Sequence, residues 1–173
     1  MTVDRRVLID PWGAILGAGE KFSARDGMHR ASNETRFVFE TWVAAKSGDR
    51  LPRLSDIYPE PLGKLAESTM VLDVIGAEGA RDYRYRLVGP RQVEARVEDP
   101  TGRTVRGIYS GEVLRFCIES YDRACSSAWG LIDFSVEASA NPHFLELETL
   151  FLPLSENGES ATEILVYGHF VER

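Results

Sequence analysis

The chain has 173 residues and a mass of 19.3 kDa, enough for one domain that buries roughly 70% of its unfolded surface without a metal or a disulfide. Its composition, 43% hydrophobic and 27% charged, is that of a globular protein. No uncharged stretch approaches the ~20 residues that span a bilayer, and the first residues lack the apolar core of a secretory signal. We therefore expect a soluble cytoplasmic protein without a membrane partner.

The charge is distributed unevenly along the chain, whose net charge is −7. Residues 107–173 hold 11 acidic and 3 basic residues, whereas residues 1–106 are nearly balanced. An acidic domain without a basic stripe repels a phosphate backbone. Arginines are frequent between residues 81 and 106, but acidic residues are interleaved with them, which is typical of a solvated surface of mixed charge. We expect no nucleic-acid partner.

The N-terminal part divides into two segments. Residues 1–32 contain a turn signal and scattered glycines, and we expect a tail or arm there. Residues 33–48 show the cap and apolar spacing of a helix. Apolar side chains of this helix, including Phe37, Phe39 and Trp42, occupy more than one face. One stripe can cover a sheet while another contacts a second subunit, so the helix is predicted to take part in dimerisation.

Residues 49–173 carry strand and helix patterns in an order without βαβ repeats. A proline-rich connector and a short helix come first. The predicted strands cover residues 70–75, 83–87, 132–137, 144–154 and 162–171, and a long helical pattern covers residues 112–128. This order favours an α+β fold, a five-stranded antiparallel sheet with helices packed on one face and an N-terminal helical extension before it.

Several of these stretches resemble a known family. The matching segments are Leu51–Ile57, Val71–Val74, Tyr83–Gly89, Asp99–Arg103 and Leu147–Ser155. Together they resemble the PAS fold, and more narrowly a bacterial PAS subfamily once catalogued as a domain of unknown function. The subfamily usually has a small polar residue after the glycine at position 89, whereas this chain has Pro90, which suits the first turn of a helix.

The resemblance implies a sensory or interaction module rather than an enzyme. PAS domains use a cavity between the sheet and the central helices for a small ligand, or hold no ligand, and pair through sheet or N-terminal helix surfaces. Only two residues follow the last predicted strand. We therefore expect signalling through a homodimer or through a separate protein such as a kinase.

Alternation along the strands predicts the residues around such a cavity. Tyr85 and Leu87 share one face of the second strand. On the last strand, the cavity is lined either by the face that carries Tyr167 or by the opposite face. The tentative pocket, apolar with hydroxyl groups, consists of Tyr85, Leu87, Tyr109, Phe116, Phe134 and Tyr167. The alternative is that these aromatic side chains fill the core.

No cofactor motif accompanies this pocket. Cys117 and Cys125 are eight residues apart in a predicted helix, too far for a disulfide, and no metal-ligand spacing is present. None of the three histidines lies on a helix expected to line the cavity, and Cys117 lacks a flavin-adduct motif, so neither haem nor flavin is expected.

Three functions follow from the sequence. The first is a stand-alone PAS sensor that binds an unidentified small ligand. The second is a ligand-free adaptor with a filled core. The third is a small isomerase-like enzyme using Asp73 or Asp133, which would require a carboxylate of raised pKa in an open cavity. We expect no enzymatic activity and assign no catalytic residue.

Overall fold

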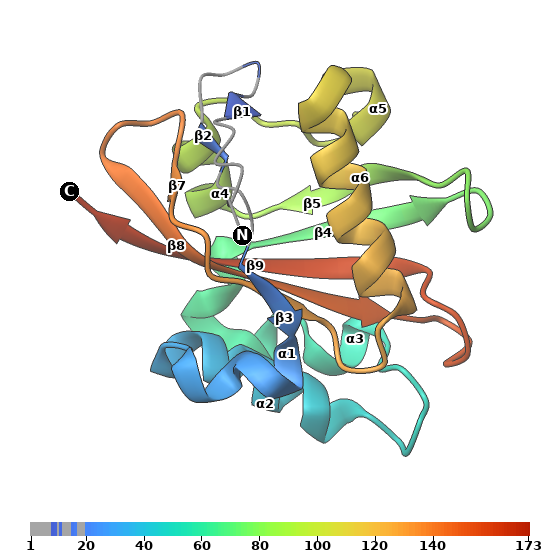
Figure 1. The fold of residues 1–173 in the computed structure, drawn as a ribbon. Coiled ribbons are helices and arrows are strands. Elements are labelled where there is room, and N and C mark those ends of the chain that lie inside the picture. The colour runs from blue at the N-terminus through green and yellow to red at the C-terminus, as the bar shows by residue number, and fades with distance from the viewer. Residues whose placement is uncertain (1–7, 10, 12–14, 17–19) are drawn as a thin grey trace, which may run out of the picture.

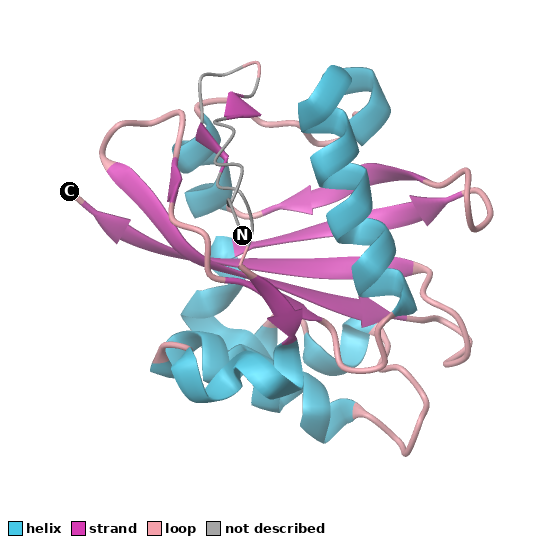
Figure 2. Ribbon diagram, viewed as in Figure 1, coloured by secondary structure: helices cyan, strands magenta, loops and turns pink. Residues whose placement is uncertain are grey.

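A computed structural model describes residues 8–9, 11, 15–16 and 20–173. One antiparallel sheet runs through the molecule, with helices on both sides (Figures 1 and 2). The strands are β1 Leu8–Ile9, β2 Ile15–Leu16, β3 Lys21–Ser23, β4 Thr69–Ile75, β5 Asp82–Val88, β6 Leu131–Asp133, β7 Glu137–Ala138, β8 Phe144–Leu154 and β9 Glu163–Glu172. The helices are α1 Ala24–Gly27, η1 Met28–Arg30, α2 Asn33–Ala45, α3 Leu54–Ile57, η2 Glu60–Ser68, α4 Pro90–Arg96, α5 Val105–Ile108 and α6 Gly111–Ser126.

The strand order confirms the α+β fold expected from the sequence. The sheet runs β1-β2-β7-β8-β9-β4-β5, with β6 between β3 and β8. Four of the predicted strands correspond to β4, β5, β8 and β9. The strand predicted over residues 132–137 is instead two short strands, β6 and β7. The side chain of Asp133 accepts a hydrogen bond from the Ser135 backbone N–H at 2.8 Å, and this local turn competes with continued strand pairing.

The helices form two layers (Figure 1). Helices α4, α5 and α6 cover one face of the sheet, as the resemblance to the PAS fold implies, while the N-terminal extension and the connector cover the other. Successive residues of β9 therefore enter different cores: Leu165 and Tyr167 pack with the N-terminal helices, and Ile164 and Val166 pack with α5 and α6. Both faces of the central strands are therefore buried.

Helix α2 packs its aromatic side chains inward, which corrects part of the predicted dimer surface. Trp42 is fully buried and donates a hydrogen bond from its indole Nε1 to the carbonyl of Pro153 at 2.9 Å. Phe39 is also buried and stacks on Trp42. Because α2 lies on the sheet, only Phe37, 48% exposed, remains available to another molecule.

Part of the segment expected to be a tail belongs to the fold. Strand β3 pairs with β6, and Ala24, Met28 and Ala31 are buried in the core beneath α2. The rest of the predicted tail lies largely outside the described residues. Within the part of the chain that the structure describes, no helix combines the length and apolar character needed to cross a membrane.

Candidate functional site

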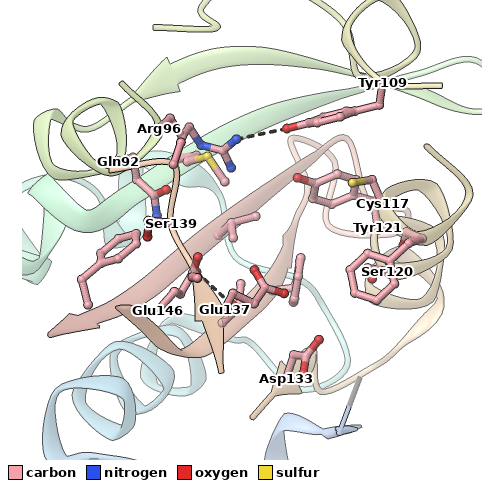
Figure 3. Close-up of a pocket in the computed structure, with 18 residues that line it drawn as sticks. Gln92, Arg96, Tyr109, Cys117, Ser120, Tyr121, Asp133, Glu137, Ser139 and Glu146 are labelled. Atoms are coloured by element: carbon pink, nitrogen blue, oxygen red, sulfur yellow. Dashed lines mark hydrogen bonds between the residues drawn. The ribbon is translucent and has the colours of Figure 1, made fainter. Parts of the chain in front are cut away.

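A cavity of about 100 Å³ lies between the sheet and the helices α4 and α6 (Figure 3). Its floor comes from β4, β8 and β9, its outer wall from β6, β7 and the residues after β7, and its remaining sides from the two helices and Tyr109. Most of its lining is apolar. Its polar groups gather at two places, one around Arg96 and the other around Glu137 and Glu146.

Helix α4 brings Arg96 to the cavity. The helix is preceded by its N-cap Gly89, which passes so close to η2 that an added Cβ would lie 2.3 Å from the carbonyl oxygen of Glu67. Gln92 then fixes the helix by donating a hydrogen bond to the carbonyl of Ser68 at 2.9 Å. At the last turn, Arg96 donates from Nη1 to the hydroxyl of Tyr109 at 3.1 Å. Its Nε is buried and has no hydrogen-bond partner among the described residues.

Three tyrosines surround this arginine. The hydroxyl groups of Tyr85 and Tyr109 are 3.5 Å apart, and Tyr121 packs from α6 in the same core. Burial is the main cause that raises the pKa of all three phenols. They are therefore neutral at physiological pH and present hydroxyl groups beside a fixed positive charge.

Carboxyl groups form the other polar part of the cavity. Glu137 on β7 and Glu146 on β8 are direct cross-strand partners, and Asp133 lies nearby on β6. Both glutamates are partly buried and line the cavity. Burial raises the pKa of both, and the neighbouring carboxylates raise that of Glu137 further. Thr149 donates a hydrogen bond to Glu146 at 2.8 Å.

An irregularity in β8 separates two glutamates that a regular strand would place on one face. The pairing of β8 with β9 shifts between Glu146 and Glu148, so Leu147 is the extra residue of a bulge. Glu146 consequently faces the cavity. Glu148 faces the opposite layer, where it accepts hydrogen bonds from Ser32 and Thr35 at the start of α2.

A comparison with protein-family models matches residues 28–169 to a family described as PAS domain. The chain belongs to the PAS domain family. Neither the curated proteins nor the solved structures gave a match. PAS domains are typically sensory or interaction modules without enzymatic activity, and the cavity here lies between the sheet and the helices, where the resemblance places a PAS ligand. The match also includes α2, which the sequence analysis assigned to a segment before the PAS domain.

The structure brings some of the predicted pocket residues of this PAS domain together. Tyr109 and Phe116 line the cavity. Tyr85 lies behind it, in the core that packs under α6 and with its hydroxyl group toward Tyr109. These three side chains are close because β5, α5 and α6 pack on one face of the sheet.

The other three predicted residues lie elsewhere, which corrects the tentative pocket. Tyr167 faces the α2 layer. Leu87 is 38% exposed, because the pairing of β4 with β5 shifts beside Arg86 and turns Leu87 away from the face of Tyr85. Phe134 packs against Phe22, with ring centroids 6.1 Å apart, and with the N-terminal core rather than the cavity.

Arg96, Glu137 and Glu146 were not predicted as residues of the cavity. Glu146 carried a signal, since it interrupts an otherwise apolar strand in the sequence. Arg96 carried none, because it is one of seven arginines between residues 81 and 106. Of the acids considered for catalysis, Asp133 lines the cavity, while Asp73 pairs with Arg86 at 2.9 Å on the sheet. Within the described part of the chain, no group of three or more histidine, cysteine or acidic side chains could hold a metal.

Proposed function

We propose that this PAS domain binds a small molecule in the cavity between the sheet and α4–α6, and that it signals through a second copy of itself or a separate protein such as a kinase. The observation that carries the proposal is Arg96, a buried guanidinium whose Nε has no partner among the described residues. A buried donor left unpaired costs free energy. A molecule in the cavity that carries an acceptor group or a negative charge beside Arg96 compensates this buried guanidinium.

Native mass spectrometry of the purified protein, compared with its denatured mass, tests this proposal. We expect extra mass that disappears on denaturation. A matched variant, Ser120→Leu, places an apolar side chain in the cavity wall, where Ser120 is 2% exposed, and is expected to lose that mass. Ser160→Leu, on the exposed turn before β9, serves as the control. Equal retained mass in both variants would contradict a ligand in this cavity.

A ligand-free adaptor is the second candidate, and the size of the cavity favours it. Typical ligand sites measure roughly 300–1,000 Å³, whereas this cavity measures about 100 Å³. The same volume supports the expectation that neither haem nor flavin is the ligand. If the protein is a ligand-free adaptor, Ser120→Leu fills the cavity without changing the affinity for the partner. In the sensor, the same variant alters the response of the partner.

A further inference from the structure

We propose that the ligand is a small zwitterion, a molecule carrying a carboxylate and an ammonium group a few atoms apart, as a small α-amino acid does. This inference rests on the proposed function, because it specifies the ligand of the same cavity. It follows from two groups of opposite charge that line one small space without contacting each other (Figure 3).

The positive group is the guanidinium of Arg96. Its Nη1 donates to Tyr109, its Nε has no partner among the described residues, and its side chain lines the cavity. An arginine keeps its charge at physiological pH, and its planar fork fits the two oxygens of a carboxylate. The hydroxyl of Tyr109 lies beside the same fork. A carboxylate is therefore the group that this side of the cavity recognises.

The negative group is the cross-strand pair of Glu137 and Glu146, with Asp133 next to them. No ion pair joins either glutamate to a basic residue within the described part of the chain, and Glu137 makes no side-chain hydrogen bond there. Partly buried carboxylates without an ion-pair partner are costly, and two of them side by side repel each other. An ammonium group placed between them offsets both effects and donates up to three hydrogen bonds.

The two groups select a zwitterion over a simple anion or amine. No ion pair connects Arg96 with Glu137 or Glu146. The cavity therefore has a positively charged group on one side and two carboxyl groups on another. An anion would leave the carboxyl pair without an ion-pair partner, and an amine would leave the charge of Arg96 without one. The cavity volume, about 100 Å³, is below that of typical ligand sites and favours a small ligand.

Binding of a zwitterion is linked to pH through the carboxyl pair. Glu137 is surrounded by Glu146, Asp133, Arg96 and Lys21, and Glu146 by Thr149, Arg96 and Asp133. Burial and the neighbouring acids favour the protonated carboxyls in the empty cavity. An ammonium group favours the ionised carboxyls, so binding releases protons. Affinity is therefore expected to rise as the pH rises above the ordinary glutamate pKa of 4.5.

Isothermal titration calorimetry of the full chain tests the inference with five probes: glycine, L-alanine, L-serine, propionate and ethylamine. We expect at least one amino acid to bind about tenfold more tightly than propionate and ethylamine. Arg96→Gln and Glu146→Gln should each weaken that binding about tenfold or more. Arg96→Lys, which keeps the charge but loses the fork, should also weaken it. The control is Arg91→Gln on the same helix, where Arg91 pairs with Glu172 at 3.3 Å and should not matter.

The outcomes separate this inference from the proposed function. Propionate binding as tightly as L-alanine would overturn the zwitterion but leave a ligand-binding PAS domain. Ethylamine binding as tightly would do the same. If none of the five probes binds at millimolar concentration, the zwitterion is wrong, and the native mass then decides the proposed function. Extra mass in the native protein supports a different ligand. A native protein without extra mass contradicts both the zwitterion and the proposed function.

Discussion

The carboxylate of Glu148 connects the first turn of α2 to the sheet. It accepts hydrogen bonds from the backbone N–H of Ser32 at 2.8 Å, from the Ser32 hydroxyl at 2.9 Å and from the hydroxyl of Thr35. Glu148 is only 8% exposed. A negative charge at a helix N-terminus is also stabilised by the helix dipole. One side chain of β8 thus satisfies several donors of the N-terminal layer.

Replacing Glu148 by glutamine tests this connection. The amide of Glu148→Gln keeps the shape but loses the charge and one acceptor oxygen, so we expect the free energy of unfolding to fall by about 2–3 kcal/mol. Urea unfolding followed by circular dichroism measures the loss. Glu159→Gln, on an exposed turn, should change the free energy by less than about 0.5 kcal/mol. Equal effects of the two substitutions would remove Glu148 from this role.

At the level of residues, the sequence predicts side-chain direction only where the strands are regular. Alternation correctly places Tyr83 and Tyr85 on one buried face of β5. It fails at Leu87, beyond the irregularity at Arg86, because an extra residue reverses every later side chain. The sequence around that position carries no mark of the shift, so the pocket could be predicted only in part.

The junction between β5 and α4 depends on the absence of a side chain at Gly89. Its backbone N–H donates to the carbonyl of Thr69 at 2.8 Å, and the carbonyl of Glu67 occupies the position of a Cβ. Its φ of −64° suits any residue, so close packing alone requires glycine. We expect Gly89→Ala to destabilise the fold by about 1–3 kcal/mol.

Thermal unfolding by calorimetry measures this effect. Gly107→Ala in α5 is the matched control, because the nearest obstacle there is the hydroxyl of Thr104, 3.0 Å from the added Cβ. The control should lose less stability than Gly89→Ala. The opposite order would show that the chain at Gly89 moves away from η2 at little cost.

Helix α2 makes a separate prediction about assembly. Phe37 is the exposed member of the three aromatic residues first assigned to a dimer. If a second copy binds this helix, Phe37→Glu lowers the dimer fraction and leaves the melting temperature nearly unchanged, because the side chain lies outside the core. Sedimentation velocity at several protein concentrations measures the fraction. A wild-type chain that stays monomeric, or a dimer unaffected by Phe37→Glu, would rule out this surface.

At the level of elements, the sequence predicts long periodic segments well. The helix expected over residues 112–128 is α6, Gly111–Ser126, and the helix expected over residues 33–48 is α2, Asn33–Ala45. The strand expected over residues 132–137 breaks, because the hydrogen bond from Ser135 to Asp133 forms locally. Such short-range competition depends on side-chain geometry that periodicity does not contain.

Across the whole molecule, the carboxyl pair of the cavity is expected to shape the pH dependence of stability. Because burial raises the pKa of Glu137 and Glu146 above the ordinary value of 4.5, the folded chain holds protons that the unfolded chain releases. Their contribution to stability therefore falls as the pH rises above about 4.5. Glu146→Gln removes one of these groups, so the variant should gain stability relative to the wild type with rising pH.

Urea unfolding between pH 4 and pH 8 measures this difference. We expect the curves of wild type and Glu146→Gln to converge near pH 4 and to separate toward pH 8. Glu94→Gln, exposed on α4, should follow the wild-type pH dependence. Parallel curves for Glu146→Gln and wild type would show that the carboxyl group ionises as freely in the fold as in the unfolded chain.

The site was harder to predict than the fold, for a reason that concerns the whole molecule. Fold class follows from the order of strands and helices, and the residue patterns along the sequence predict that order. The cavity takes its charges from α4, β6, β7 and β8, and sequence alone gives no distance between Arg96 and Glu146. Their significance depends on tertiary packing.

The bulge at Leu147 has a mechanical consequence. Glu146 lines the cavity and Glu148 holds α2, so two consecutive peptide units join the interior of one layer to the first turn of the other. Peptide units are planar and stiff, so the backbone torsions around Leu147 set the directions of the two carboxylates relative to each other. A single bulge of β8 therefore places the residue that lines the cavity and the residue that holds α2 next to each other along the chain.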